Sequence, residues 1–393
     1  MLSWDAARSM LKDESLPALL VDRDAFDRNV RASAAKASAA GKPLRVATKS
    51  VRSVGLIDRA LEIGGPHLRG LLAYSIDEAV LLAGRGHHDI LVAYPSIDRR
   101  ALDSVATRAP DAITLMVDEQ AHLDAIQAVA SARGVTLSVA IELDVSFRPN
   151  VRADVHLGPR RSPLRTPEAV LALARSIATR PSLKLAALMG YEAHIAGISD
   201  ESLAMRAFKR TAWPRVAELR AETVYALQRA SLLPPIVNGG GSGSVTATLG
   251  DPSTTEGTIG SGLLCAHLFD HFTADRYEPA LFIALETCRV PDRDHVTCRG
   301  GGYVASGPPA LDRLPKPVLP EGLAYVVREA GGEVQTPLAV GRASHIPAVG
   351  DPVLFRPAKS GEIAERFREH VLFSKGRIAG RSPTYRGEGW CFF

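Results

Sequence analysis

The feature that most limits the possible fold is a regular alternation of short apolar runs with longer segments rich in Ala, Leu, Arg and Glu. Short apolar runs bounded by turn residues are typical of buried strands, and the longer segments are typical of helices. The strand-like runs are 44–48, 70–74, 90–94, 113–117, 137–143, 185–190, 235–238 and 256–260. Eight strand–helix units in succession predict an α/β fold, a closed (β/α)8 barrel of the TIM type. A doubly wound open sheet is the alternative.

The last third of the chain follows a different pattern. Short strands separated by turns are expected at 281–290, 296–306, 323–328, 352–355 and 370–373, which predicts a second, β-rich domain. The early strand-like run 18–22 precedes the first strand–helix unit, and we expect it to join the sheet of this second domain. The predicted organisation is a barrel over residues 23–277 and a β-rich domain formed by residues 1–22 and 278–393.

The composition excludes several classes of function. The chain has 393 residues, and its 47 basic and 43 acidic residues are interspersed, which leaves no basic surface for nucleic acid. No apolar run is long enough to span a membrane, and the amino terminus lacks the features of a signal peptide. The four cysteines have no CxxC spacing, so we expect reduced thiols rather than a zinc cluster or disulfides. These features predict a cytoplasmic protein that acts on a small molecule.

A lysine and two glycine-rich loops fall at the same end of the predicted barrel. Lys49 follows the first strand in RVATKS, and VNGGGSGS (237–244) and TIGSG (258–262) follow the seventh and eighth strands. Barrels bind phosphate in these two loops, and closure makes the first strand a neighbour of the eighth. We therefore expect an anion site within reach of Lys49, although each glycine run alone also fits a tight turn. Arg45 and Arg52 are expected to supply charge to the amine or to bind phosphate, and the loop 147–165 is expected at the same face.

The order and spacing of these motifs resemble the fold type III pyridoxal-phosphate enzymes, in particular the D-threonine aldolases and D-serine dehydratases, which are relatives of alanine racemase. The resemblance rests on LPALLVDRDAFDRNV, RVATKS, GPRRSPL, LMGYEAHIAG, NGGGSGS and TEGTIGSG, and it covers nearly the whole chain. GGGYVASGP and PTYRGEG are similar to a group called amino acid deaminase/aldolase. The resemblance implies an alanine racemase-like barrel with a β-domain, pyridoxal 5'-phosphate as cofactor, and a homodimer with the active site near the subunit interface.

The resemblance also implies roles for individual residues. Lys49 would form the Schiff base, Arg161 would lie near the phenolic oxygen of the cofactor, with Arg160 as the alternative, and Tyr191 would lie beside the ring. The phosphate would be surrounded by Gly240, Gly241, Ser242, Gly243, Gly260 and Ser261.

Two further residues are candidates for catalysis. His194 is placed to act as a general base on a substrate β-hydroxyl, because imidazole titrates near working pH, and its alternative is a structural histidine. Tyr303 resembles in placement the tyrosine that alanine racemase contributes from the second subunit, and its alternative is a packed aromatic residue.

One departure from the family pattern concerns the divalent metal. Where the metal-using aldolases and dehydratases carry a His-x-Cys or His-x-Asp pair, this chain has Lys359 and Gly361. The acidic-acidic-histidine motif before the pair is altered to GEVQTP, which leaves Gln335. Neither an ammonium group nor glycine offers a ligand, so we predict that no divalent metal is required. We expect Lys359 and Gln335 to contact the substrate.

A second departure concerns the type of reaction. Thr258 stands at the position of the arginine that alanine racemase holds against the ring nitrogen, which favours bond cleavage over racemisation. We therefore expect a lyase that cleaves a β-hydroxy-D-amino acid into glycine or a simple amino acid and an aldehyde. The alternatives are a D-serine-type dehydratase or deaminase, an amino-acid racemase, a cofactor-binding protein without turnover, and a barrel that binds another phosphorylated ligand.

Overall fold

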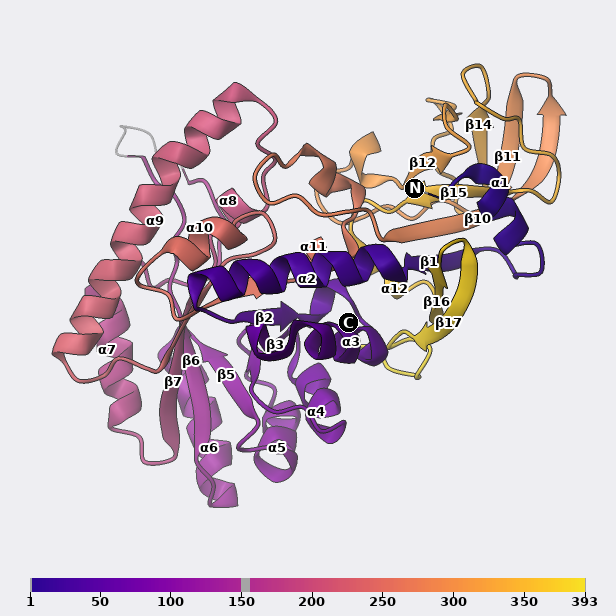
Figure 1. The fold of residues 1–393 in the computed structure, drawn as a ribbon. Helices are drawn as coiled ribbons and strands as arrows, with labels where there is room; N and C mark the ends of the chain where they lie inside the picture. The colour runs from indigo at the N-terminus through magenta and orange to yellow at the C-terminus, as the bar shows by residue number, and fades with distance from the viewer. Residues whose placement is uncertain (1, 150–155, 393) are drawn as a thin grey trace.

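A closed barrel of parallel strands forms the larger part of the computed structural model, which describes residues 2–149 and 156–392 (Figure 1). The strands follow one another around the barrel in chain order, and the last pairs with the first. They are β2 Leu44–Ala47, β3 Leu68–Ala73, β4 Ile90–Val92, β5 Ile113–Val117, β6 Leu137–Glu142, β7 Leu183–Gly190, β8 Ile236–Gly239 and β9 Glu256–Ile259. The predicted (β/α)8 barrel is confirmed, because an open doubly wound sheet would not join β2 to β9.

Helices cover the outside of the barrel between successive strands (Figure 1). Several begin at a side-chain cap, as α5 does where Asp98 accepts hydrogen bonds from the N–H groups of Arg100 and Ala101. The α-helices of this part are α2 Arg23–Ala40, α3 Val54–Gly64, α4 Ile76–Gly84, α5 Arg99–Arg108, α6 Gln120–Arg133, α7 Pro167–Ala178, α8 Ala193–Ala196, α9 Leu203–Arg229, α10 Val245–Gly250 and α11 Ser261–Leu264. The 3₁₀ turns are η1 Thr48–Ser50, η2 Gly65–His67 and η3 His267–His271. None of the helices in the described ranges is long and apolar enough to cross a membrane.

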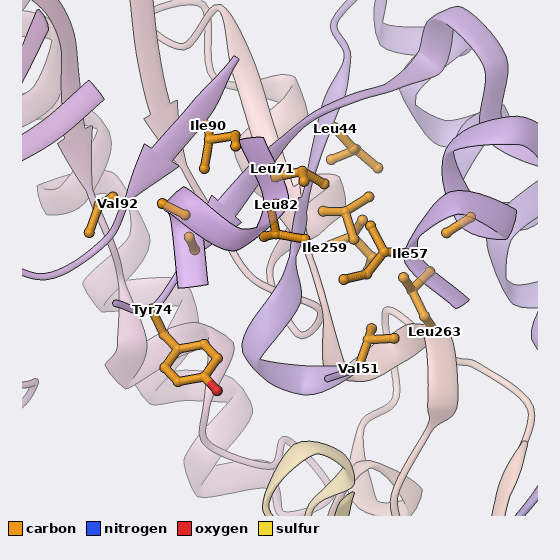
Figure 2. Close-up of a cluster of buried hydrophobic side chains, with 14 of the residues drawn as sticks. Leu44, Val51, Ile57, Leu71, Tyr74, Leu82, Ile90, Val92, Ile259 and Leu263 are labelled. Atoms are coloured by element: carbon orange, nitrogen blue, oxygen red, sulfur yellow. The ribbon is translucent and has the colours of Figure 1, made fainter. Parts of the chain in front are cut away.

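The hydrophobic core lies between the barrel strands and these helices. In Figure 2, strand residues such as Leu44, Leu71 and Ile259 gather with Ile57 of α3 and Leu82 of α4. All five are at most 1% exposed, and burial of such a side chain contributes roughly 1.5–3 kcal/mol relative to leaving it in water. This packing fixes the strand ends on which the loops of the barrel mouth are built.

The barrel interior contains a buried ion pair. Because side chains alternate along a strand, Arg45 of β2 points inward while its neighbours pack against the helices. Its guanidinium Nε lies 2.7 Å from Glu256 Oε1 and its Nη2 lies 2.9 Å from Asp89 Oδ1. Asp89 precedes β4, so Arg45 points toward the amino ends of the strands, away from Lys49. The expectation that Arg45 serves the amine or a phosphate is therefore wrong.

A separate mixed sheet combines both ends of the chain (Figure 1). It is made of β1 Ala18–Asp22, β10 Leu281–Asp292, β11 His295–Arg299, β12 Lys316–Leu319, β13 Ala324–Tyr325, β14 Gln335–Ala339, β15 Pro352–Arg356, β16 Glu369–Ser374 and β17 Arg377–Pro383. It is accompanied by α1 Trp4–Met10, α12 Ser360–Ala364 and the 3₁₀ turn η4 Leu311–Arg313. As expected, β1 joins this sheet, between β10 and β16.

The observed strands of the β-rich part differ from the predicted ones. The strand expected over 323–328 is limited to Ala324–Tyr325, and β12, β14 and β17 were not predicted. The strand expected over 296–306 ends at Arg299, because Gly300 and Gly301 adopt φ of +83° and +121°, which a regular strand does not allow. The domain boundaries at residues 22/23 and 277/278 stay a prediction.

Candidate active site

Lys49 lies at the carboxyl end of the barrel. It belongs to η1, which follows β2 directly, and its Nζ donates a hydrogen bond to Tyr94 Oη at 3.2 Å. Tyr94 follows the end of β4 by two residues and was not singled out from the sequence. A cavity of about 460 Å³ borders both side chains. Its other lining residues are Arg52, Tyr74, Ser75, Ile76, Asp77, Pro95, Ser96, Asp98 and Ala101.

Arg161 stacks between two tyrosine rings beside the lysine. Its guanidinium carbon lies 5.2 Å from the ring centre of Tyr94 and 5.2 Å from that of Tyr191, within the range of a cation–π contact. Its Nη1 lies 3.5 Å from Glu142 Oε1. Of the two arginines that the sequence left open, Arg161 is the one that contacts Tyr94, the hydrogen-bond partner of Lys49, although both arginines are exposed.

These charges and the burial of the site shift the titration of its acids. Burial raises the pKa of Glu142 to about 7, although the charge of Arg161 acts in the opposite direction. Burial also raises the pKa of Tyr191. Burial acts to raise the pKa of Tyr94 too, but the charges of Lys49 and Arg161 outweigh it, so the pKa of Tyr94 is lowered. The two cations therefore make Tyr94 easier to ionise than an ordinary tyrosine.

The two glycine-rich loops lie together and touch the lysine turn. Ser242 Oγ accepts hydrogen bonds from the N–H groups of Gly262 at 2.8 Å and Gly260 at 3.4 Å. Ser261 Oγ lies 3.1 Å from Ser50 Oγ, which is next to Lys49 in sequence. A Cβ on Gly260 would lie only 2.9 Å from that of Ala47, so glycine is required for this close approach. The predicted neighbourhood of the lysine and the loops is thus present in the structure.

A buried carboxylate holds the first of these loops. Glu192 is 0% exposed and accepts hydrogen bonds from Gly240 N–H, Ser244 Oγ and Thr248 Oγ1. Arg220 of α9 lies 3.1 Å from Glu192 and 2.5 Å from Asp251, and it is 1% exposed. This network was not predicted from the sequence, because Arg220 has the sequence surroundings of an ordinary arginine in a polar helix.

The loops keep free donors for an anion. Within the described ranges, the amide N–H groups of Ser242, Gly243 and Ser261 donate no hydrogen bond. A Cβ on Gly241 would lie 3.1 Å from the ring of Tyr191, so the same loop packs against that ring. Converging amide donors of this kind bind phosphate.

Of the predicted catalytic, cofactor and substrate residues, Lys49 is the one that lines this cavity among the described residues. Arg161, Tyr191 and the glycine-rich loops lie beside it, and four further predicted residues also lie outside its lining. His194 is 2% exposed, lies 6.3 Å from the ring of Phe208, and neither of its nitrogens has a hydrogen-bond partner in the described chain. Tyr303 packs on Phe367 at 5.7 Å, and burial raises the pKa of its phenol. The remaining two are Gln335, which is exposed at the start of β14, and Lys359, which donates to Ser306 Oγ at 2.7 Å and lies 3.4 Å from Glu362. Their functional roles stay predictions.

Gly361 contacts the lysine turn directly. A Cβ at this position would lie 1.8 Å from the carbonyl oxygen of Lys49, so α12 packs on this turn without room for a side chain.

Of the loop 147–165, residues 150–155 lie outside the described residues, and Arg165 Nε contacts Asp144 Oδ2 at 3.2 Å.

The barrel and its sheet agree with the comparisons to known proteins. The family model of the alanine racemase N-terminal domain matches residues 21–263, so the chain belongs to this family. A 3-hydroxy-D-aspartate aldolase of Paracoccus denitrificans (strain Pd 1222) is 28% identical over 234 residues, 58% of this chain and 54% of that relative. The match therefore spans about half the length of this relative.

Two further proteins are similar over more of their length. A D-threonine aldolase of Arthrobacter sp. is 24% identical over 304 residues, 75% of this chain and 74% of the relative. The crystal structure of D-threonine aldolase from Filomicrobium marinum superposes with a TM-score of 0.82 at 22% identity, covering 98% of this chain and 97% of the other. At this identity, the structural match shows a shared fold.

Proposed function

We propose that this chain is a pyridoxal-phosphate-dependent lyase that cleaves a β-hydroxy-D-amino acid between Cα and Cβ. The products would be glycine or a simple amino acid and an aldehyde. The observation that carries the proposal is the position of Lys49, which contacts Tyr94 on one side while its turn touches the glycine-rich loops through Ser50 and Ser261. The names of the two aldolase relatives support the same type of reaction.

The residues present fit pyridoxal 5'-phosphate. Lys49 would carry the cofactor covalently, and Arg161 and Tyr191 would hold its ring. Its phosphate would bind in the loops of Gly240, Gly241, Ser242, Gly243, Gly260 and Ser261. Among the described residues, the amide N–H groups of Ser242, Gly243 and Ser261 donate no hydrogen bond and would be available to it. When bound, this cofactor supplies a ring that stabilises the electron pair released at Cα.

The chain's own residues favour cleavage over racemisation. Thr258, at the place of the racemase arginine, is 4% exposed and exchanges hydrogen bonds with Asn238 at 3.0 and 3.1 Å. This pair is neutral, so it places no permanent positive charge there. The sequence predicts His194 as the group that takes the β-hydroxyl proton, a role for which Tyr94 is the competing candidate, and Tyr303 is proposed to act from a neighbouring subunit.

We further propose that the reaction needs no divalent metal. At the first ligand position of the metal-using relatives stands the ammonium group of Lys359, and at the second stands Gly361, where a side chain would collide with the lysine turn. Ammonium groups do not ligate metals. Lys359 would instead hold the substrate carboxylate or β-oxygen, and Gln335 would also contact the substrate.

A homodimer is proposed as the working form, in the cytoplasm. Val304, Val327 and Val334 belong to the β-rich part and are 60%, 75% and 69% exposed. These exposed apolar side chains, of which Val304 follows Tyr303 in sequence, support a contact between two copies that would bring Tyr303 to the partner's site.

The proposal is tested by incubating the purified, cofactor-loaded protein with single enantiomers of threonine and serine. Glycine and acetaldehyde from D-threonine alone, and no product with Lys49→Ala, are expected. A keto acid with ammonia would instead indicate a dehydratase, and the mirror-image amino acid without cleavage would indicate a racemase.

A further inference from the structure

Tyr94 is the polar side chain in hydrogen-bond contact with the amine of Lys49 among the described residues. Its Oη accepts from Lys49 Nζ at 3.2 Å, and both groups line the cavity at the barrel mouth. The phenol follows the end of β4, at the barrel face where catalytic groups are built. A substrate that reaches Lys49 through this cavity meets Tyr94 at the same time.

The groups around Tyr94 decide its charge. Lys49 from the first turn and Arg161 from the loop after β6 carry the positive charges that face it, and Glu142 of β6 and Tyr191 after β7 are the acids nearby. The positive charges lower the pKa of Tyr94 against the effect of burial. Burial raises the pKa of Glu142 to about 7, so Glu142 counteracts the positive charges less at and below that pH. The phenolate is thus accessible at lower pH here than in an ordinary tyrosine.

We infer that Tyr94 takes the proton from the β-oxygen of the substrate and exchanges it with Lys49, which protonates Cα. This role rests on the proposed lyase function. In the reaction the electron pair of the O–H bond becomes the second bond of the aldehyde carbonyl, and the Cα–Cβ bond breaks. The electron pair that remains on Cα then takes up a proton. One proton moves from oxygen to carbon, so no oxidant or reductant is needed. The contact between Tyr94 and Lys49 provides the path.

The sequence predicted that His194 takes the proton from the β-oxygen of the substrate. The surroundings of His194 and Tyr94 differ. His194 does not line the cavity that contains Lys49, and its pKa is lowered by burial, with no hydrogen-bond partner in the described chain to orient it. Tyr94 lines the cavity and is oriented by Lys49 and Arg161. The two assignments predict opposite results for matched variants.

The first experiment separates the two proton transfers. In Tyr94→Phe, borohydride should still fix the cofactor to Lys49, and exchange of the glycine Cα proton in deuterium oxide, followed by NMR, should stay within roughly threefold of wild type. Aldehyde formation from the β-hydroxy-D-amino acid should fall by roughly 10²–10⁴-fold, the usual contribution of general acid–base catalysis. The matched control His194→Gln should lose less than roughly tenfold in aldehyde formation.

A second measurement uses the apoprotein and needs no activity. The chain has eight tyrosines, and a pH titration of near-ultraviolet phenolate absorbance should show one phenol that ionises before the others and is missing in Tyr94→Phe. If no early phenol is found, the inference is overturned, even when the wild type cleaves substrate. Equal losses of exchange and cleavage in Tyr94→Phe would also overturn it, because Tyr94 would then act only by positioning Lys49. A wild type that exchanges glycine but cleaves no β-hydroxy-D-amino acid would contradict the proposed function and, with it, the role on the β-oxygen.

Discussion

Glu78, a carboxyl group buried behind the lysine turn, allows a quantitative test of the structure. Glu78 of α4 is 0% exposed and accepts hydrogen bonds from Tyr74 N–H at 2.8 Å and Tyr385 Oη at 2.7 Å. The side chain of Thr48, the residue before Lys49, also acts to lower the pKa of Glu78, while its hydroxyl donates to the carbonyl oxygen of Leu72. Burial raises the pKa of Glu78 from 4.5 to about 7, although these hydrogen bonds and the charge of Arg52 lower it.

The sign and size of the effect follow from the two pKa values. Between about pH 4.5 and 7 the folded protein keeps a proton on Glu78 that the unfolded chain has lost, so the free energy of unfolding falls as pH rises. The stabilisation that comes from the proton on Glu78 is fully present below about pH 4.5 and is lost as pH rises through about 7. A difference of about 2.5 pKa units corresponds to about 3 kcal/mol.

The change to test is Glu78→Gln, which keeps the shape and removes the titration. The free energy of unfolding should be measured with urea at about pH 5 and about pH 8. Between these pH values the variant should gain nearly the full difference of about 3 kcal/mol relative to wild type, because only a small part of the titration lies below pH 5. Glu119→Gln, at an exposed carboxyl group, serves as the control and should show no such gain. If the free energies of unfolding of Glu78→Gln and wild type differ by the same amount at both pH values, the raised pKa assigned to the buried Glu78 is refuted.

Three further predictions concern the same end of the barrel. Gly361→Ala places a Cβ 1.8 Å from the carbonyl oxygen of Lys49 and should cost roughly 1–3 kcal/mol in urea unfolding. The control Gly341→Ala, which has no atom within 4 Å of the new Cβ, should leave the free energy of unfolding unchanged. Equal losses in the two variants would contradict the close contact between Gly361 and the lysine turn. Arg220→Met leaves Glu192 and Asp251 without their cation and should lower stability by roughly 3–5 kcal/mol, whereas an unchanged thermal unfolding curve would show that the triad is dispensable. Dialysis against a strong chelator should leave aldehyde formation unchanged, and a loss restored by manganese or zinc would reject the metal-free proposal.

Much of the architecture was predictable because it depends on patterns that are local in sequence. Buried parallel strands read as apolar runs, and the order of strands around a closed barrel then brings the first strand beside the eighth. This is why the proximity of Lys49 to the Gly240 and Gly260 loops was predictable before any side chain was placed. Strand β1 was recognised in the same way, since its residues are buried on both faces.

The contacts that define the chemistry depend on side-chain direction and were not predictable. Arg45 was misassigned because its inward direction, toward Glu256 at the amino end of the barrel, follows from strand register rather than from its distance to Lys49 in sequence. Tyr94 was included in a strand and overlooked, because only the closed barrel shows that it meets Lys49 and Arg161. The signal that marks it is a tyrosine just beyond the carboxyl end of a barrel strand.

The central claim is that the amine of Lys49 carries a cofactor whose phosphate lies in the adjoining glycine-rich loops. The most direct measurement is an absorbance spectrum of the purified protein with pyridoxal 5'-phosphate, before and after borohydride, followed by mass analysis of the labelled peptide. We expect a band close to the visible range that reduction converts to a permanent label on Lys49, and no such band or label in Lys49→Ala. A label on another lysine, or the same label in Lys49→Ala, would contradict the claim.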